Sequence, residues 1–148
     1  MGSASADGSN AWSLTLTGVA EGVHSYTAKA TNSTSGLTSV ASAPIRVTVD
    51  TTKPTVGSLV PAPGSSTRDR TPSIEATVRD SQTNLAKTNI RLFIDGRRVT
   101  TFAYDRATDR LSYTPTSALS LGSHTVKVEA RDAAGNVATK QWGFKVVR

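Results

Sequence analysis

The chain contains an internal repeat in which the second copy follows the first at an offset of 100 residues. The matched residues are Gly22 and Gly122, His24 and His124, Ala30 and Ala130, and Asn32 and Asp132. Around both sets apolar and polar residues alternate, which is typical of a strand with one buried face. A repeat of this kind predicts two copies of one structural unit, so the fold of one copy constrains the fold of the other.

Composition favours strands over helices throughout the chain. Thr and Ser account for 22 and 18 of the 148 residues. Thr fits the exposed face of a pleated strand well and has only modest helix propensity. No stretch of useful length shows the 3.6-residue period of an amphipathic helix. The sequence therefore predicts an all-β protein.

Several functional classes are excluded by residue types that are rare or missing. The chain has no Cys, which excludes disulfides, thiolate nucleophiles and Cys-ligated metal sites. Its two His are too few for most zinc sites and most catalytic sites. The apolar runs are only a few residues long, far short of the roughly 18 that a membrane span needs, so no membrane insertion is expected.

Residues 50–54, Asp-Thr-Thr-Lys-Pro, mark the boundary between the two copies, because this polar run ends a strand and Pro54 lacks a backbone donor. We expect residues 1–9 to be a disordered tag or linker. Residues 10–50 are predicted to be a partial repeat, and residues 51–148 a complete domain. The last span is long enough for a seven-stranded sandwich.

Alternating apolar residues predict the strands of both copies. In the complete domain the expected strands are 56–60, 74–78, 90–94, 99–104, 111–114, 125–130 and 137–147. The partial repeat holds only the equivalents of the last three, at 12–16, 25–30 and 44–49. Trp12 and Trp142 alternate in phase with their apolar neighbours, so we expect both in a core. Three strands with one apolar face are marginally stable, and something must cover that face.

Three segments and a Trp carry a resemblance to a known family. They are Trp12 before a strand, Glu-Gly-Val-His at 21–24, Val-Asp-Thr-Thr-Lys-Pro at 49–54 and Ala-Arg-Asp-Ala-Ala-Gly-Asn at 130–136. Together they resemble the bacterial immunoglobulin-like repeats of large secreted and surface-anchored proteins. The resemblance covers the chain from about Ala11 onward. It implies an antiparallel immunoglobulin-like β-sandwich, preceded by the last three strands of a second copy.

The same resemblance implies a working context. Such repeats form tandem arrays with neighbouring Ig-like domains and serve as stalk, spacer or adhesion modules, usually without catalysis. The expected location is secreted or on the bacterial cell surface. The leading hypothesis is therefore a non-catalytic structural module, and two alternatives stay open. One is a module that binds carbohydrate or an anionic polymer. The other is a self-assembling unit, a homo-oligomer completed by strand exchange through residues 10–50.

A cation site is expected where the chain enters the complete domain. An immunoglobulin topology brings the loop after the second strand and the loop before the last strand to this pole, so Asp80 and Asp132 should face Asp50. Asn136 is a fourth candidate ligand, and Ca²⁺ prefers six to eight oxygen ligands of this kind. The alternative is structural: Asp132 caps its turn and Asp80 forms an Asx-turn.

Basic charge is concentrated in residues 51–148, and Arg91, Arg97 and Arg98 are candidate ligand-binding residues there. Guanidinium groups match the geometry of carboxylates and phosphates, so a surface glycan or other anionic polymer would suit them. The alternative is a solvated surface. Nucleic acid is not expected, because no stacking aromatics are interleaved with the basic residues.

The two His occupy equivalent places at the start of equivalent strands. This indicates that position selects them, and we expect each ring to hydrogen-bond a backbone carbonyl. Nothing near either His resembles a catalytic triad, so no catalytic residue is predicted and the protein is not expected to be an enzyme.

Overall fold

The computed structural model describes residues 2–148. The chain divides into two compact units, Met1–Asp50 and Thr51–Arg148. Of the predicted tag or linker at residues 1–9, Met1 lies outside the described residues.

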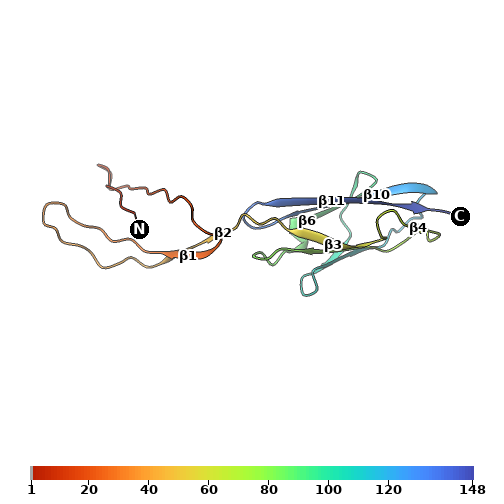
Figure 1. The fold of residues 1–148 in the computed structure, drawn as a ribbon, viewed down its shortest axis with the longest axis horizontal. Coiled ribbons are helices and arrows are strands. Elements are labelled where there is room, and N and C mark those ends of the chain that lie inside the picture. The colour runs from red at the N-terminus through yellow and green to blue at the C-terminus, as the bar shows by residue number, and fades with distance from the viewer. Residues whose placement is uncertain (1) are drawn as a thin grey trace. The chain divides into compact units, whose positions relative to one another are not determined.

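The C-terminal unit is a β-sandwich of two sheets (Figure 1). One sheet has the strand order β4 (Ser66–Thr67), β11 (Val137–Val146), β10 (Gly122–Arg131), β6 (Ile90–Ile94) and β7 (Arg97–Val99). The other has the order β3 (Thr55–Val60), β5 (Ile74–Arg79), β9 (Arg110–Tyr113) and β8 (Ala103–Asp105). Neighbouring strands are antiparallel, except for the parallel pair β4 and β11. The predicted all-β immunoglobulin-like sandwich is confirmed.

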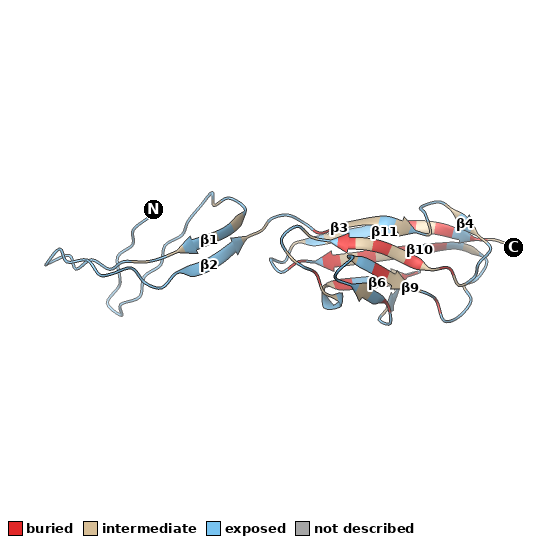
Figure 2. Ribbon diagram, turned by 90° about the horizontal axis from the view of Figure 1, so that it is seen from below, coloured by how far each residue is buried: buried red, intermediate tan, exposed pale blue. Residues whose placement is uncertain are grey.

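The core lies between the two sheets and is built mainly from alternate residues of β5, β6, β10 and β11, as Figure 2 shows in red. The buried apolar residues are Ile74, Ala76, Val78, Leu85, Ile90, Leu92, Ile94, Phe102, Leu111, Val126, Val128, Ala130, Trp142, Phe144 and Val146. Trp142 is in the core as predicted, and its indole N–H donates to the Pro61 carbonyl at 3.0 Å. This bond satisfies the one polar group that the ring brings into the core.

The single strand predicted at 99–104 is wrong. Strand β7 ends at Val99 in one sheet and β8 begins at Ala103 in the other, so the chain crosses between sheets here. Phe102 lies in the crossing and is buried, which keeps an apolar side chain in the middle of a segment that is not a strand. The two-residue strand β4 and the short 3₁₀ helix η1 (Lys87–Asn89) have no alternating pattern and were not predicted.

The N-terminal unit contains one antiparallel pair, β1 (Gly22–Tyr26) and β2 (Ile45–Val49). The strand predicted at 12–16 is wrong, because this segment has irregular backbone. The core position predicted for Trp12 is also wrong, since 57% of this residue is exposed. Alternation alone does not make a strand when no neighbouring strand takes up its backbone hydrogen bonds and no second sheet covers its apolar side chains.

Within the C-terminal unit the chain enters and leaves at opposite poles. Thr55, the first residue of β3, pairs with Arg79, and Asp80 follows directly. Carboxylate oxygens of Asp80 and Asp132 lie within 4.8 Å of each other, so the turn before β11 is at the same pole. From there β11 extends for 10 residues, about 30 Å, and ends at Val146 near the C-terminus.

Candidate functional site

The pole where the chain enters the C-terminal unit holds two neighbouring carboxylates. Asp80 follows the last residue of β5, and Asp132 follows the last residue of β10. Asp132 is only 3% exposed. The sandwich topology brings these residues together although they are far apart in the sequence, because both strands end at the same pole.

Most of the hydrogen bonds at this pole are those of the structural alternative. Asp132 accepts from the backbone N–H and the side-chain amide of Asn136, both at 2.8 Å, and so closes the turn before β11. Gly135 takes a φ of +98° in this turn. Asp80 Oδ1 accepts from the backbone N–H groups of Gln82 and Thr83 at 2.9 and 2.7 Å, which is an Asx-turn.

One carboxylate oxygen at this pole accepts no hydrogen bond from the described residues. Asp80 Oδ2 is buried and has no hydrogen-bond partner among the described residues. Two neighbouring carboxylates in a buried place repel each other, and an unpaired buried oxygen costs further free energy. A bound cation relieves both penalties, so the pole has the chemistry of an oxygen-ligand cation site. Asp50, the third predicted carboxylate, is half-buried and is the last residue of the N-terminal unit.

The predicted arginines are not all on one face. Arg91 on β6 is exposed and lies opposite Glu129 in the register of β6 on β10. Arg98 on β7 pairs with Phe93, so these two side chains lie on the outer face of the sheet with Arg91. Arg97 pairs with the buried Ile94, and alternation therefore places its side chain on the opposite face.

An aromatic ring stands among these basic residues. Phe93 pairs with Lys127 on its other side, and the Lys127 ammonium lies 4.2 Å from the centroid of the Phe93 ring. Lys127 also forms an ion pair of 2.8 Å with Glu129. The sequence did not predict this arrangement, because Phe93 and Lys127 lie on different strands and only the register of β6 on β10 brings them together.

His124 is buried and both of its ring nitrogens are bonded. Nε2 donates to the Ser120 carbonyl at 2.9 Å, and Nδ1 donates to Asp95 Oδ2 at 2.7 Å. Asp95 Oδ1 accepts from the backbone N–H of Thr125 at 2.8 Å. The expected bond of His124 to a backbone carbonyl is confirmed, whereas its bond to Asp95 was not predicted. A His and an Asp 29 positions apart give no local signal of their pairing.

This pair shifts the pKa of both groups. Burial acts to lower the pKa of His124, but the hydrogen bonds to Asp95 and to the Ser120 carbonyl outweigh it and the pKa is raised. Burial acts to raise the pKa of Asp95, but the hydrogen bonds from His124 and Thr125 outweigh it and the pKa is lowered. Both shifts favour the charged form of the group concerned. The two partners of the ring, a carboxylate oxygen and a carbonyl oxygen, are acceptors, so each ring nitrogen acts as a donor in this geometry.

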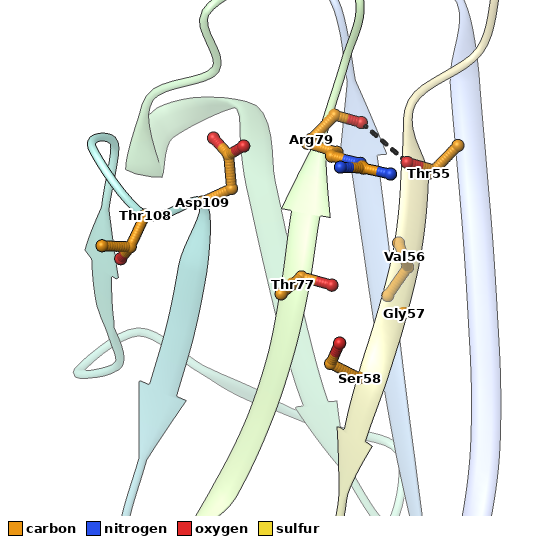
Figure 3. A pocket seen from close by; sticks show the side chains of 8 residues that line it. All are labelled: Thr55, Val56, Gly57, Ser58, Thr77, Arg79, Thr108 and Asp109. Carbon is orange, nitrogen blue, oxygen red and sulfur yellow. Dashed lines mark hydrogen bonds between the residues drawn. The ribbon is translucent and has the colours of Figure 1, made fainter.

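A depression of about 390 Å³ lies along β3, β5 and the β8–β9 turn (Figure 3). Its lining includes the Arg79 guanidinium and the Asp109 carboxylate among Thr, Ser and Gly residues. Beside it, Tyr104 donates to the Val78 carbonyl at 2.6 Å and fixes the turn. Burial, together with the nearby Asp109, raises the pKa of Tyr104 to about 12, so this hydroxyl stays protonated and structural.

Comparison with known proteins decides the family. The sequence profile of the bacterial Ig-like domain matches residues 62–147, which is more than half of the chain. The chain belongs to the bacterial Ig-like domain family. Bacterial Ig-like domains are generally not enzymes and are typically extracellular. No helix of the described residues is long and apolar enough to cross a membrane.

Two solved structures share this Ig-like fold. CopC from Methylosinus trichosporium OB3b is 13% identical with a TM-score of 0.51, over 63% of this chain and 92% of that one. The endo-beta-1,4-mannanase from Thermotoga petrophila is 16% identical with a TM-score of 0.54, over 67% of this chain and 21% of the mannanase. This chain thus spans about a fifth of the mannanase. At such identities the likeness shows the fold alone. A search of curated proteins found no match.

Proposed function

We propose that this chain is a non-catalytic, extracellular structural module of a bacterial surface or secreted protein, and that its C-terminal Ig-like domain works as a spacer. One observation carries the proposal: the chain enters this domain beside Asp80 and leaves it after Val146, at the other end of β11. A module with its two connections at opposite poles keeps its neighbours on the two sides apart.

The strand arrangement suits a spacer that is pulled from its two connections. Strands β5 and β10 both end at the pole where the chain enters, and β3 and β11 are their antiparallel partners, so β3 and β11 both run away from that pole (Figure 1). Tension between the two connections therefore acts along β3 and β11. Such tension pulls β3 along β5 and β11 along β10, parallel to the strands. Several hydrogen bonds of each ladder must then break at the same time.

Single-molecule stretching of the full chain tests this proposal. Unfolding of Thr51–Arg148 should appear as one cooperative event that releases about 300 Å of contour length, from about 3.5 Å per residue less the folded length. The variant Phe144→Ala should lower the unfolding force and leave the contour length unchanged, because it weakens the core without changing the number of residues. Extension without a force peak, or in several small steps, would contradict the spacer.

We further propose that Ca²⁺ binds where the chain enters the domain, with Asp80 and Asp132 as ligands and Asn136 completing the set. The buried Asp80 Oδ2 and its proximity to Asp132 support this proposal. The Ca²⁺ dependence of the melting temperature tests it.

A second candidate function is the binding of an anionic surface glycan on the outer face of β6, β7 and β10. The Phe93 ring with Lys127, Arg91 and Arg98 around it favours this candidate, because an aromatic face and cations together suit a charged sugar. A heparin-type array at two salt concentrations measures it. Arg98→Gln should reduce binding, and Arg97→Gln, on the opposite face, is the matched control. Equal losses from both variants would contradict a defined face.

A further inference from the structure

The N-terminal unit repeats the end of the Ig-like domain in detail. Strands β1 and β2 pair in the same register as β10 and β11. In the partial copy Gly22 lies opposite Val49, His24 opposite Val47 and Tyr26 opposite Ile45. The equivalent pairs of the complete copy are Gly122 with Val146, His124 with Phe144 and Val126 with Trp142. The two glycines have φ angles of +121° and +125°. His24 Nε2 bonds the Ala20 carbonyl at 2.7 Å, as His124 Nε2 bonds the Ser120 carbonyl. The neighbours of β10 in the complete copy therefore indicate which contacts suit the equivalent strand β1 of the partial copy.

In the complete copy the other edge of β10 is occupied by β6. Ile94 pairs with Val126 and Leu92 pairs with Val128, so apolar residues of β6 continue the buried face. Asp95 follows the last residue of β6, and its carboxylate accepts hydrogen bonds from His124 Nδ1 and from the Thr125 N–H. The Asp95 backbone N–H also donates to the Thr125 carbonyl at 2.9 Å. One strand and its turn thus cover both the edge and the ring.

In the partial copy this edge is open. The sheet has two strands, and no described residue pairs with the edge of β1 that faces away from β2. The Ala28 carbonyl accepts from the Ser42 N–H, and the Ala28 N–H donates to the Ser42 hydroxyl. The backbone N–H and C=O groups of the even-numbered residues in this segment therefore point toward the β2 side. The N–H and C=O of Ser25 therefore point to the open edge. His24 Nδ1 has no hydrogen-bond partner among the described residues.

The apolar side chains beside this edge are also uncovered. Ile45 and Val47, the equivalents of Trp142 and Phe144, are 68% and 45% exposed. An open edge next to exposed apolar side chains is a surface that takes up a further strand.

We propose that the open edge of β1 binds one antiparallel strand of a second Ig-like repeat, with the pattern Ile-x-Leu-x-Ile-Asp-Gly of β6. Its last Ile lies opposite Tyr26, and its Leu lies opposite Ala28. Its Asp carboxylate accepts from His24 Nδ1 and from the Ser25 N–H, as Asp95 accepts from His124 and Thr125. The carboxylate selects this partner over other apolar strands, because it alone satisfies the His24 ring and the backbone donor together. The inference does not depend on the spacer function.

The test uses the full chain, labelled with ¹⁵N, and a peptide with the sequence of residues 89–96. Titration should shift the amide signals of Ser25 and Tyr26 and leave those of β10 unchanged, since β6 already covers β10. The same peptide with Asp95→Asn should bind at least about tenfold more weakly, because it loses the ionised acceptor. The peptide control leaves the fold of the chain untouched.

Three outcomes would overturn the proposal. One is the absence of any shift at Ser25 with peptide in the millimolar range. Another is equal affinity of the Asp and Asn peptides, which would mean general edge pairing without the carboxylate. The third is a chain that dimerises through β1 in sedimentation experiments and that the peptide does not dissociate, which would mean that two β1 edges pair with each other and not with a strand of the β6 type.

Discussion

Strand pairs β1–β2 and β10–β11 have the same register and very different burial (Figure 2). Val47 is 45% exposed where its equivalent Phe144 is 3% exposed, and Ile45 is 68% exposed where Trp142 is 5% exposed. The shared register shows that local sequence is enough to set the pairing of two strands. Burial, however, comes from the seven other strands that only the C-terminal unit contains.

The energetic consequence is large. A buried Phe or Trp removes about 150–250 Å² from water, and at about 25 cal/mol per Å² this stabilises the fold by about 4–6 kcal/mol for each ring. The N-terminal unit has no side chain in a comparable environment among its described residues, since none of residues 2–50 is buried. Its two strands are therefore held mainly by their ladder.

Amide hydrogen exchange should differ most between the two strand pairs. In the full chain, amides of β10 and β11 should exchange at least about a thousandfold more slowly than those of β1 and β2, because exchange in the core strands requires global unfolding. Mass spectrometry with peptide resolution measures this. Similar protection of the two strand pairs would mean that the face of the N-terminal unit is covered in solution.

The next effect compares matched side chains in the two copies. Phe144→Ala should lower the free energy of unfolding by about 3–5 kcal/mol, because it leaves a cavity in the core. Val47→Ala at the equivalent position should change it by no more than about 0.5 kcal/mol, because this side chain is already in contact with water. Urea denaturation followed by circular dichroism measures both. A loss of stability from Val47→Ala near that from Phe144→Ala would contradict the difference in burial between the two copies.

A smaller effect is expected from Ca²⁺, and it should belong to one copy only. At the repeat offset Asn32 replaces Asp132, and Asn32 Oδ1 accepts from the backbone N–H groups of Thr34 and Ser35. Saturating Ca²⁺ should raise the melting temperature of the C-terminal unit by several degrees, and a chelator should reverse the rise.

The control for Ca²⁺ is a pair of variants at equivalent turns. Asp132→Asn, which resembles the turn of the partial copy, should abolish the rise, whereas Asn32→Ala should leave it intact. Calorimetry and thermal melts report the two variants. A rise that survives Asp132→Asn would remove Asp132 from the proposed ligand set.

The smallest effect is the pH dependence that His124 and Asp95 give to the C-terminal unit. The raised pKa of His124 stabilises the fold below the unfolded value of about 6.5, and this contribution is lost as the pH rises through the folded pKa. The lowered pKa of Asp95 stabilises the fold above about 3.9, and this contribution is lost on acidification through the folded pKa. Together they act most strongly between about pH 4 and 6.5.

Chemical denaturation from pH 4 to 8 measures this dependence. His124→Gln should flatten the decline in stability on the alkaline side of this window. His24→Gln is the matched control and should leave the curve unchanged, because no carboxylate bonds the His24 ring among the described residues. An unchanged curve for His124→Gln would show that the pair contributes no linked stability.

The parts of the fold that sequence predicts are those set by local alternation. The strands β5, β6, β10 and β11 were expected within a few residues, because each alternates over its length. The crossing between β7 and β8 was missed, because Phe102 is apolar and buried without being in a strand. The segment at 12–16 alternates as a strand does, but no residue within 2–148 pairs with it in a ladder.

The candidate site was likewise predicted in part, and the remainder depends on contacts between distant strands. Asp80 and Asp132 were expected at one pole from topology alone, and the structure places their carboxylates within 4.8 Å of each other. The pairing of Asp95 with His124 depends on the position of the β6–β7 turn beside β10, which no short pattern in the sequence encodes. The grouping of Phe93 with Lys127 likewise depends on register.

The doubly bonded ring of His124 also bears on which metals this unit can hold. An imidazole whose two nitrogens both donate has no lone pair left for coordination, and His124 is the only His among residues 51–148. The same residues contain neither Cys nor Met. The unit therefore offers metal ions oxygen ligands alone, which favours hard cations such as Ca²⁺ and Mg²⁺ and disfavours copper and zinc.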